Sequence, residues 1–141
     1  MRTVSRLHML DTDIASYIIK KRSPAIEAKL ALIPPSQVCI SVVTRAELLY
    51  GLKRLPPAHR LHVGVRQFLR VVRSVYWDVE AAEYYADIRH QLLSDGQPIG
   101  EMDMMIAAHS LSAGASLVTN NTRLYSRIQA PLTLVNWASP D

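Results

Sequence analysis

The chain contains one cysteine, one phenylalanine and no unbroken apolar run of the roughly 18 to 20 residues that a membrane-spanning helix needs. Cys39 has no second cysteine to pair with, so an internal disulfide is excluded. Its apolar neighbours in VCISVV indicate a small core side chain rather than a nucleophile. The start, MRTVSRLHML, lacks the apolar core and cleavage site of a secretion signal. We therefore expect a cytoplasmic protein that does not insert into a membrane.

Sites for soft metals are excluded by the same scarcity. One cysteine cannot build a zinc cage, and the five histidines show no HExxH spacing. Internal repeats, linkers and low-complexity segments are missing as well. With 141 residues, of which 49% are hydrophobic, the chain is long enough to bury a core, and we expect residues 1–141 to form a single domain.

Positive charge, by contrast, is present in excess. The formal net charge is +4 and the pI is near 9.5. Only four of the 16 basic residues are lysines, and arginine grips phosphate with a planar fork that lysine lacks. The balance favours an anionic partner, but a basic surface without a specific partner fits the composition as well.

Short apolar segments have the character of buried strands. They are the stretch before Asp11, VCISVV at 38–43, ASLVT at 115–119 and TLVNW at 133–137. A brief extended piece is also expected at 75–79.

Helical patterns fall between these strands. Serine followed by proline at Ser23 is a typical helix start, and the prolines at 56–57 separate two helices that we expect to form a helical hairpin. The predicted helices begin at Asp13 and Ser23 and cover 44–53, the basic segment 59–73, 80–93 and 100–109. Strands that alternate with helices predict an α/β domain, with a central, mainly parallel sheet flanked by helices.

Acidic residues follow the predicted strands at the places where chemistry is expected, because ligands of parallel sheets gather at the carboxyl ends of the strands. Asp11 follows the first strand, Glu47 lies one turn into the helix after VCISVVT, and Asp103 stands at the head of the apolar helix. Carboxylates brought to one pocket repel one another unless a cation holds them, and hard cations such as Mg²⁺ and Mn²⁺ prefer oxygen ligands. The pattern therefore indicates Asp11, Glu47 and Asp103 as metal ligands.

Helix capping offers another interpretation of several acids. Thr44 and Glu47 have the spacing of a capping box, and we expect Asp13 to be the N-cap of the first helix. Glu101 and Asp103 both suit the positive end of a helix dipole, but residues two apart cannot share a helical face. We expect Asp103 to enter the pocket, Glu101 to meet solvent, and His109 to be a packed or surface histidine.

The segment VTNNTRLYSR at 118–127 adds polar side chains after the strand at 115–119. Thr119, Asn120 and Asn121 can form a simple turn, or they can orient a phosphate or a water molecule. Arg123 can hold a backbone phosphate. The sequence leaves both interpretations open.

Four motifs together resemble the PIN-domain ribonucleases, and within them the VapC toxins of toxin-antitoxin modules. They are MLDTDI (9–14), ISVVTRAELLYG (40–51), IGEMDMMIAAH (99–109) and LVTNNTRLYSRI (117–128), and they lie along nearly the whole chain. The last of them is similar to the TNNTREF-type segment of that group.

The resemblance implies a PIN-like domain whose metal-binding acids correspond to Asp11, Glu47 and Asp103. It also implies an Mg²⁺-dependent endoribonuclease that hydrolyses a tRNA or a ribosomal RNA loop, a homodimer, and a VapB-type antitoxin through which alone DNA is contacted. The sequence departs from the pattern where many relatives carry a further acid. Asn120 and Asn121 stand there instead, and Leu124 replaces a glutamate. One firm metal site is therefore expected.

Two other functions remain open. A catalytically silent RNA-binding module would keep the basic surface without an effective metal site. An enzyme with an aspartate nucleophile is suggested by Asp11 and Asp13 after a strand, but no lysine follows a later strand, where such sites need one.

Overall fold

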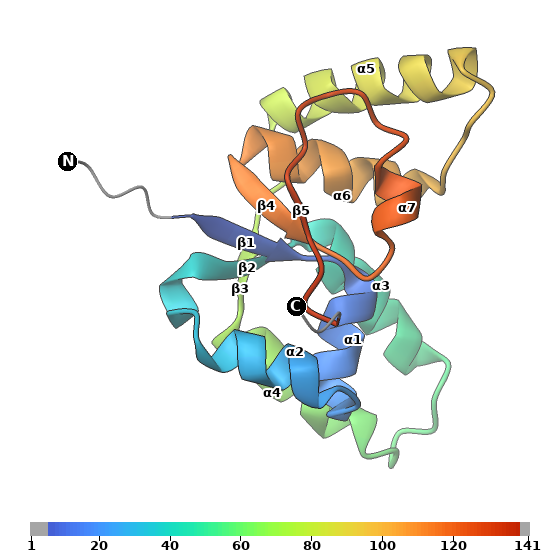
Figure 1. Ribbon diagram of the computed structural model, residues 1–141. Helices are drawn as coiled ribbons and strands as arrows, with labels where there is room; N and C mark the ends of the chain where they lie inside the picture. Colours follow the sequence, from blue (N-terminus) through green and yellow to red (C-terminus); the bar gives the residue numbers. More distant parts are fainter. Residues whose placement is uncertain (1–5, 139–141) are drawn as a thin grey trace.

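The computed structural model describes residues 6–138, and its centre is one five-stranded, fully parallel sheet (Figure 1). The strand order is β3-β2-β1-β4-β5. The bounds are β1 Leu7–Leu10, β2 Val38–Ser41, β3 Arg73–Val75, β4 Ala115–Val118 and β5 Leu134–Val135. All four apolar segments predicted as strands are confirmed, whereas the extended piece expected at 75–79 ends at Val75.

Seven α-helices and one 3-10 helix are seen in the described part of the chain. They are α1 Thr12–Lys20, α2 Pro24–Ala31, η1 Pro35–Gln37, α3 Val42–Lys53, α4 Leu61–Val71, α5 Val79–Ser94, α6 Glu101–Ser112 and α7 Thr122–Tyr125. The predicted hairpin is present as α3 and α4, which pack on each other and on α1. The short helices η1 and α7 were not predicted, because they begin in segments that sequence patterns assign to turns.

The helices cover both faces of the sheet, with α1, α2 and α4 on one side and α5 and α6 on the other (Figure 1). One apolar cluster joins the sheet to the first group, through side chains such as Leu10, Ile14 and Phe68. A second cluster joins it to the other group, through Leu117, Ile88 and Ile106. The α/β fold with a flanked parallel sheet is thus confirmed.

Three helix starts show how local chemistry sets the boundaries. Ser23 caps α2 as predicted, with its hydroxyl accepting a hydrogen bond from the Ile26 amide at 3.2 Å. The N-cap of α1 is Asp11, so the assignment of that role to Asp13 was wrong. The chain leaves β1 in extended geometry up to Asp11, which therefore reaches the free amides of the first turn.

The helix α3 begins two residues earlier than predicted, at Val42. Ser41, the last residue of β2, caps it by accepting a hydrogen bond from the Val43 amide at 3.0 Å. Thr44 is consequently a buried residue inside the helix, and the capping box predicted for Thr44 and Glu47 is not formed. Glu47 is free for a different contact.

The central strand β1 has β2 on one side and β4 on the other. The chain order reverses at this point, and in parallel sheets such a reversal opens a crevice at the carboxyl ends of the two diverging strands. Asp11 leaves β1 there, with its amide donating to the Val118 carbonyl at 3.0 Å. None of the helices within residues 6–138 combines the length and apolar character needed to cross a membrane.

Candidate active site at the carboxyl ends of β1 and β4

Asp11 is the most deeply buried carboxylate at this edge, with 5% of its surface exposed. Its Oδ1 accepts a hydrogen bond from the Ile14 amide at 2.8 Å, and the Thr119 hydroxyl donates to it as well. Burial nevertheless raises the pKa of Asp11 from 3.8 to about 6, and the negative charges of Asp13 and Asp103 act in the same direction. The fold therefore places the Asp11 carboxylate where its ionised form is disfavoured.

Asp103 reaches the same crevice from the first turn of α6. Its Oδ1 accepts a hydrogen bond from the Tyr125 hydroxyl at 3.2 Å. A Cβ atom added to Gly100 would stand 2.9 Å from Oδ2, so a larger residue here would force the carboxylate to shift. Burial raises the pKa of Asp103 above its ordinary value, and the charge of Asp13 adds to the effect.

Tyr125 is a buried donor beneath these acids, with 2% of its surface exposed. Burial raises the pKa of its hydroxyl far above the ordinary value, and the charges of Asp103 and Asp11 reinforce the shift. The hydroxyl therefore stays protonated and donates to Asp103 at any physiological pH. Its position in α7, behind Asp103, fixes the direction in which that carboxylate points.

Asp13 is an additional member of the cluster. Its side chain is exposed in the first turn of α1, and its charge raises the pKa of both Asp11 and Asp103. The structure therefore brings together three carboxylates at the carboxyl end of β1. We call Asp11, Asp13 and Asp103 the aspartate cluster.

Glu47 lies beside the aspartate cluster rather than inside it. Its Oε1 accepts a hydrogen bond from the Thr12 hydroxyl at 2.5 Å, and the same hydroxyl lies 3.1 Å from Thr44 Oγ1. A cavity of about 340 Å³ is lined by both Glu47 and Asp13. Glu47 thus faces the crevice from α3, at a position set by two threonines.

The arrangement defines which metals the site could hold. Within residues 6–138, no three Asp, Glu, His or Cys side chains stand close enough together to form a complete metal site by themselves. The donors that converge are carboxylate and hydroxyl oxygens, which suit hard cations that retain several water ligands. The mutual repulsion within the aspartate cluster would be relieved by such a cation.

The sequence left two interpretations open for the segment after β4: a simple turn, or groups that orient a phosphate or a water molecule. The Asn121 amide donates to Thr119 Oγ1 at 2.9 Å, which makes Thr119 to Asn121 a turn that leads into α7. Thr119 is also fully buried and bonded to Asp11, so it orients a carboxylate. Asn120, Asn121 and Arg123 are exposed, and nothing in the structure tests their predicted contacts with a phosphate.

Three other residues considered for function, Cys39, His109 and Glu101, have surroundings that indicate structural roles. Cys39 is buried, and burial raises the pKa of its thiol to about 11, so it is not a nucleophile at neutral pH. His109 is buried, with Nδ1 2.7 Å from the Ser41 hydroxyl. Glu101 is exposed and forms an ion pair with Arg89 at 3.0 Å. The prediction that Asp103, and not Glu101, enters the pocket agrees with these contacts.

Comparisons with known proteins identify the family of this chain. The PIN domain family matches residues 8–130. The tRNA(fMet)-specific endonuclease VapC of Salmonella typhimurium is 39% identical over 121 residues, which cover 85% of this chain and 90% of the relative. Ribonuclease VapC2 of Haemophilus influenzae is 35% identical over 130 residues, or 92% of this chain and 97% of the relative.

A solved structure agrees with these sequence matches. The crystal structure of VapBC2 from Rickettsia felis, bound to a DNA fragment from their promoter, contains a chain that superposes with a TM-score of 0.84 at 31% identity. The superposition covers 93% of this chain and 98% of the other. The protein therefore belongs to the PIN domain family and, within it, to the VapC group.

Proposed function

We propose that this protein is a metal-dependent endoribonuclease and the toxin of a toxin-antitoxin module. The observation that carries the proposal is the aspartate cluster. Its buried Asp11 and half-buried Asp103 are titratable carboxylates that lie where the strand order of the parallel sheet reverses. The names of the relatives from Salmonella and Haemophilus describe ribonucleases, which supports the same activity here. Because these relatives act on RNA, we propose that this protein acts in the cytoplasm.

We infer that Asp11 and Asp103 hold Mg²⁺, or Mn²⁺ in its place, directly or through water, with Glu47 and Asp13 at the rim. The oxygen donors and the unrelieved repulsion among the aspartates fit such an ion. Bound there, the ion would supply charge neutralisation at the scissile phosphate and a water of lowered pKa. The protein's own groups keep the carboxylates in place: Thr119 orients Asp11, Tyr125 orients Asp103, and Thr12 orients Glu47.

The substrate we propose is a single-stranded loop of a tRNA or of ribosomal RNA, because bases in loops are accessible and the chain is basic. The basic segment 60–73 and Arg123 are candidates for gripping its backbone. Asn120 and Asn121 are candidates for orienting the phosphate or the attacking water.

The partner we propose is a VapB-type antitoxin whose C-terminal tail lies along the groove beside α3 and α4 and blocks the carboxylates. An arginine of that tail would suit the aspartate cluster. The Rickettsia structure is a VapBC2 complex bound to promoter DNA, which supports such a partner. We propose that the protein contacts DNA only through this antitoxin. We also propose a homodimer.

The products distinguish this chemistry from its rivals. Total RNA incubated with the purified protein is expected to be cut in Mg²⁺ and left intact in EDTA, and to be cut again when Mg²⁺ is restored. The new ends should carry a 5′-phosphate and a 3′-hydroxyl, because water and not the 2′-hydroxyl attacks. A 2′,3′-cyclic phosphate as primary product contradicts the mechanism, and salt-sensitive RNA binding without cleavage selects the silent binding module.

Gly100→Ala is expected to lower the rate of RNA cleavage about tenfold, because the new Cβ displaces the Asp103 carboxylate whose Oδ2 lies 2.9 Å from its position. The backbone of Gly100 has φ of −58°, which alanine adopts freely, so the cost in stability should stay near 1 kcal/mol for a poorer N-cap. Initial rates and melting curves measure the two effects. Met102→Ala, an exposed residue in the same turn, serves as the control. Equal rates for both variants would show that the placement of Asp103 is unimportant.

A further inference from the structure

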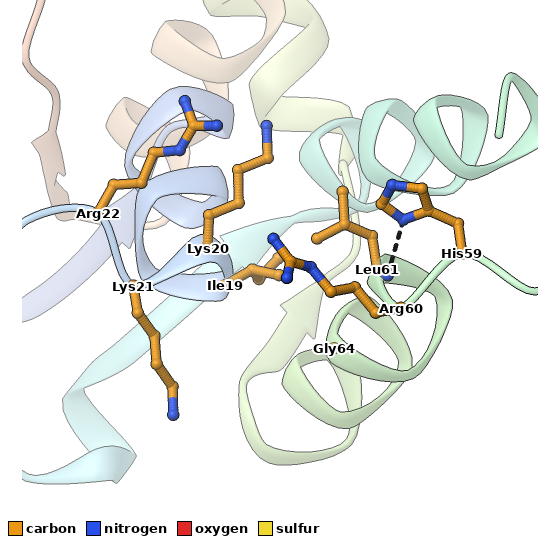
Figure 2. Close-up of a pocket in the computed structure, with 8 residues that line it drawn as sticks. All are labelled: Ile19, Lys20, Lys21, Arg22, His59, Arg60, Leu61 and Gly64. Atoms are coloured by element: carbon orange, nitrogen blue, oxygen red, sulfur yellow. Dashed lines mark hydrogen bonds between the residues drawn. The ribbon is translucent and has the colours of Figure 1, made fainter.

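A basic cavity of about 510 Å³ lies between the end of α1 and the start of α4, away from the aspartate cluster (Figure 2). Its lining includes Lys20, Lys21, Arg22 and Arg60 but no acidic residue. Figure 2 shows Arg60 reaching toward α1 and Lys20 rising on the same side, whereas Lys21 points the opposite way.

The cations of this cavity are unpaired in the described part of the chain. Lys20, Arg22 and Arg60 are exposed, and the side chain of none of them has a hydrogen bond or an ion pair within residues 6–138. By comparison, Arg89 is bonded to Glu101 and Arg45 to Ser74. Like charges gathered without counter-charges repel one another, so an anionic ligand would lower the energy of the folded chain.

The start of α4 adds to the positive potential. Arg60 is the N-cap of this 11-residue helix and makes no side-chain cap, so its guanidinium remains available. The imidazole of His59 accepts a hydrogen bond from the Leu61 amide at 3.1 Å, which fixes the preceding loop against the first turn of α4. The amides of Leu61, His62 and Val63 already donate to His59 and Arg60, so α4 adds only its dipole to the side-chain charges. Together they favour a compact anion such as a phosphate.

The basic cavity is adjacent to the cavity at the proposed active site. It shares Ile19, Lys20 and Leu61 with the neighbouring cavity of about 340 Å³, whose other end is lined by Asp13 and Glu47. Asp13 and Lys20 stand at opposite ends of α1, seven residues apart, which at about 1.5 Å per residue is roughly 10 Å. The cations therefore lie in a cavity next to the one that Asp13 and Glu47 line.

We propose that the basic cavity is a phosphate-binding subsite for the RNA strand that is cut at the aspartate cluster. The inference rests on the proposed nuclease function and adds to it a position along the strand. A separation of roughly 10 Å places the held phosphate within a few nucleotides of the cut. Lys20 and Arg60 hold the phosphate at that distance, and a substrate too short to reach them loses this contact.

The test is binding of fluorescent single-stranded RNAs of increasing length, measured with Ca²⁺, a hard cation that carboxylates can hold, in place of Mg²⁺, and with gel analysis to confirm that no strand is cut. For the unchanged protein, affinity should rise in a step once the strand spans from the carboxylates to the basic cavity. In the double variant Lys20→Ala/Arg60→Ala the step should vanish. Affinity for long strands should fall about tenfold or more, and the salt dependence of log K should lose about 0.7 per lost phosphate contact.

The matched control is Lys53→Ala/Arg89→Ala, which removes the same charge from exposed positions outside both cavities. Melting curves of both variants check the fold. If the control loses affinity as much as the test variant, binding depends on overall charge and the subsite does not exist. The subsite is also refuted if the step survives in the test variant, or if the protein binds an acidic peptide but no RNA. Cleavage assays of the unchanged protein stand apart: absence of cleavage together with an intact step refutes the nuclease and not the subsite.

Discussion

Asp103→Asn is expected to lower RNA cleavage at least about 100-fold while the fold stays intact. Asparagine has the size of aspartate and keeps an oxygen that can accept the Tyr125 hydroxyl, so the packing around α6 need not change. What disappears is one of the negative charges that converge with Asp11 and Asp13. A cation held by fewer charges binds more weakly and is less well placed, and both effects reduce the rate.

The control for this prediction is Glu101→Gln, two residues earlier in the same helix. Glu101 is exposed and paired with Arg89, so the variant removes one acid from α6 without altering the aspartate cluster. Initial rates on one RNA at several Mg²⁺ concentrations separate weaker ion binding from slower chemistry. If Asp103→Asn cleaves as fast as Glu101→Gln, the aspartate cluster is not where RNA is cut.

Parts of the fold and site that depend on simple patterns could be predicted from the sequence. Apolar strands alternating with helices predict the parallel sheet, and residues that directly follow strands must lie at its carboxyl edge. Asp11 was found by this rule and Asp103 by its place at the head of the apolar helix, and the structure brings both to this edge of the sheet. Helical geometry allowed only one of Glu101 and Asp103 to enter the pocket, since residues two apart point to different faces. The apolar neighbours of Asp103 decided the choice, with which the ion pair of Glu101 agrees.

Roles shared by similar residues could not be separated in this way. In Asp11-Thr12-Asp13 either aspartate could cap α1, and the end of β1 decides for Asp11. The capping pattern of Thr44 and Glu47 was misleading because α3 begins at Val42, where Ser41 supplies the cap. Glu47 then bonds to Thr12, a contact between residues that the sequence gives no reason to pair.

Tyr125 and Gly100 show the other limit. The bond from Tyr125 to Asp103 joins α7 to α6 across 22 positions, and the need for glycine arises only from where Asp103 Oδ2 lies. A tyrosine in a polar segment and a glycine before a helix are ordinary features in sequence. Both residues act on the direction of one carboxylate, which is a property of the packed structure.

A site that gathers carboxylates in a buried crevice should weaken the fold, and Asp11 makes the effect measurable. Burial raises its pKa from 3.8 to about 6, so between these pH values the folded chain binds a proton more tightly than the unfolded chain. The free energy of unfolding therefore falls as pH rises through this window, and the loss persists at neutral pH. At about 1.4 kcal/mol per pKa unit, the loss amounts to about 3 kcal/mol.

Asp11→Asn should consequently be inactive and more stable than the unchanged protein. Asparagine is as good an N-cap as aspartate and keeps the bond from the Ile14 amide, but it cannot ionise. In EDTA at pH 7.5 we expect a gain of up to about 3 kcal/mol, or roughly 10 °C in Tm, and almost no gain below about pH 3, where Asp11 is largely protonated in both states.

The matched control for Asp11→Asn is Asp78→Asn, since Asp78 caps α5 through the Ala81 amide in the same way. Asp78 is exposed, and the bond from that amide lowers its pKa, so its charge stabilises the fold and the substitution should give no gain at neutral pH. Denaturant unfolding of both variants across pH separates the two cases. A gain for Asp11→Asn that is equally large below about pH 3 would show that ionisation of Asp11 is not its cause. Excess Mg²⁺ should shrink the difference, because an ion that binds only the folded, unchanged protein stabilises it selectively.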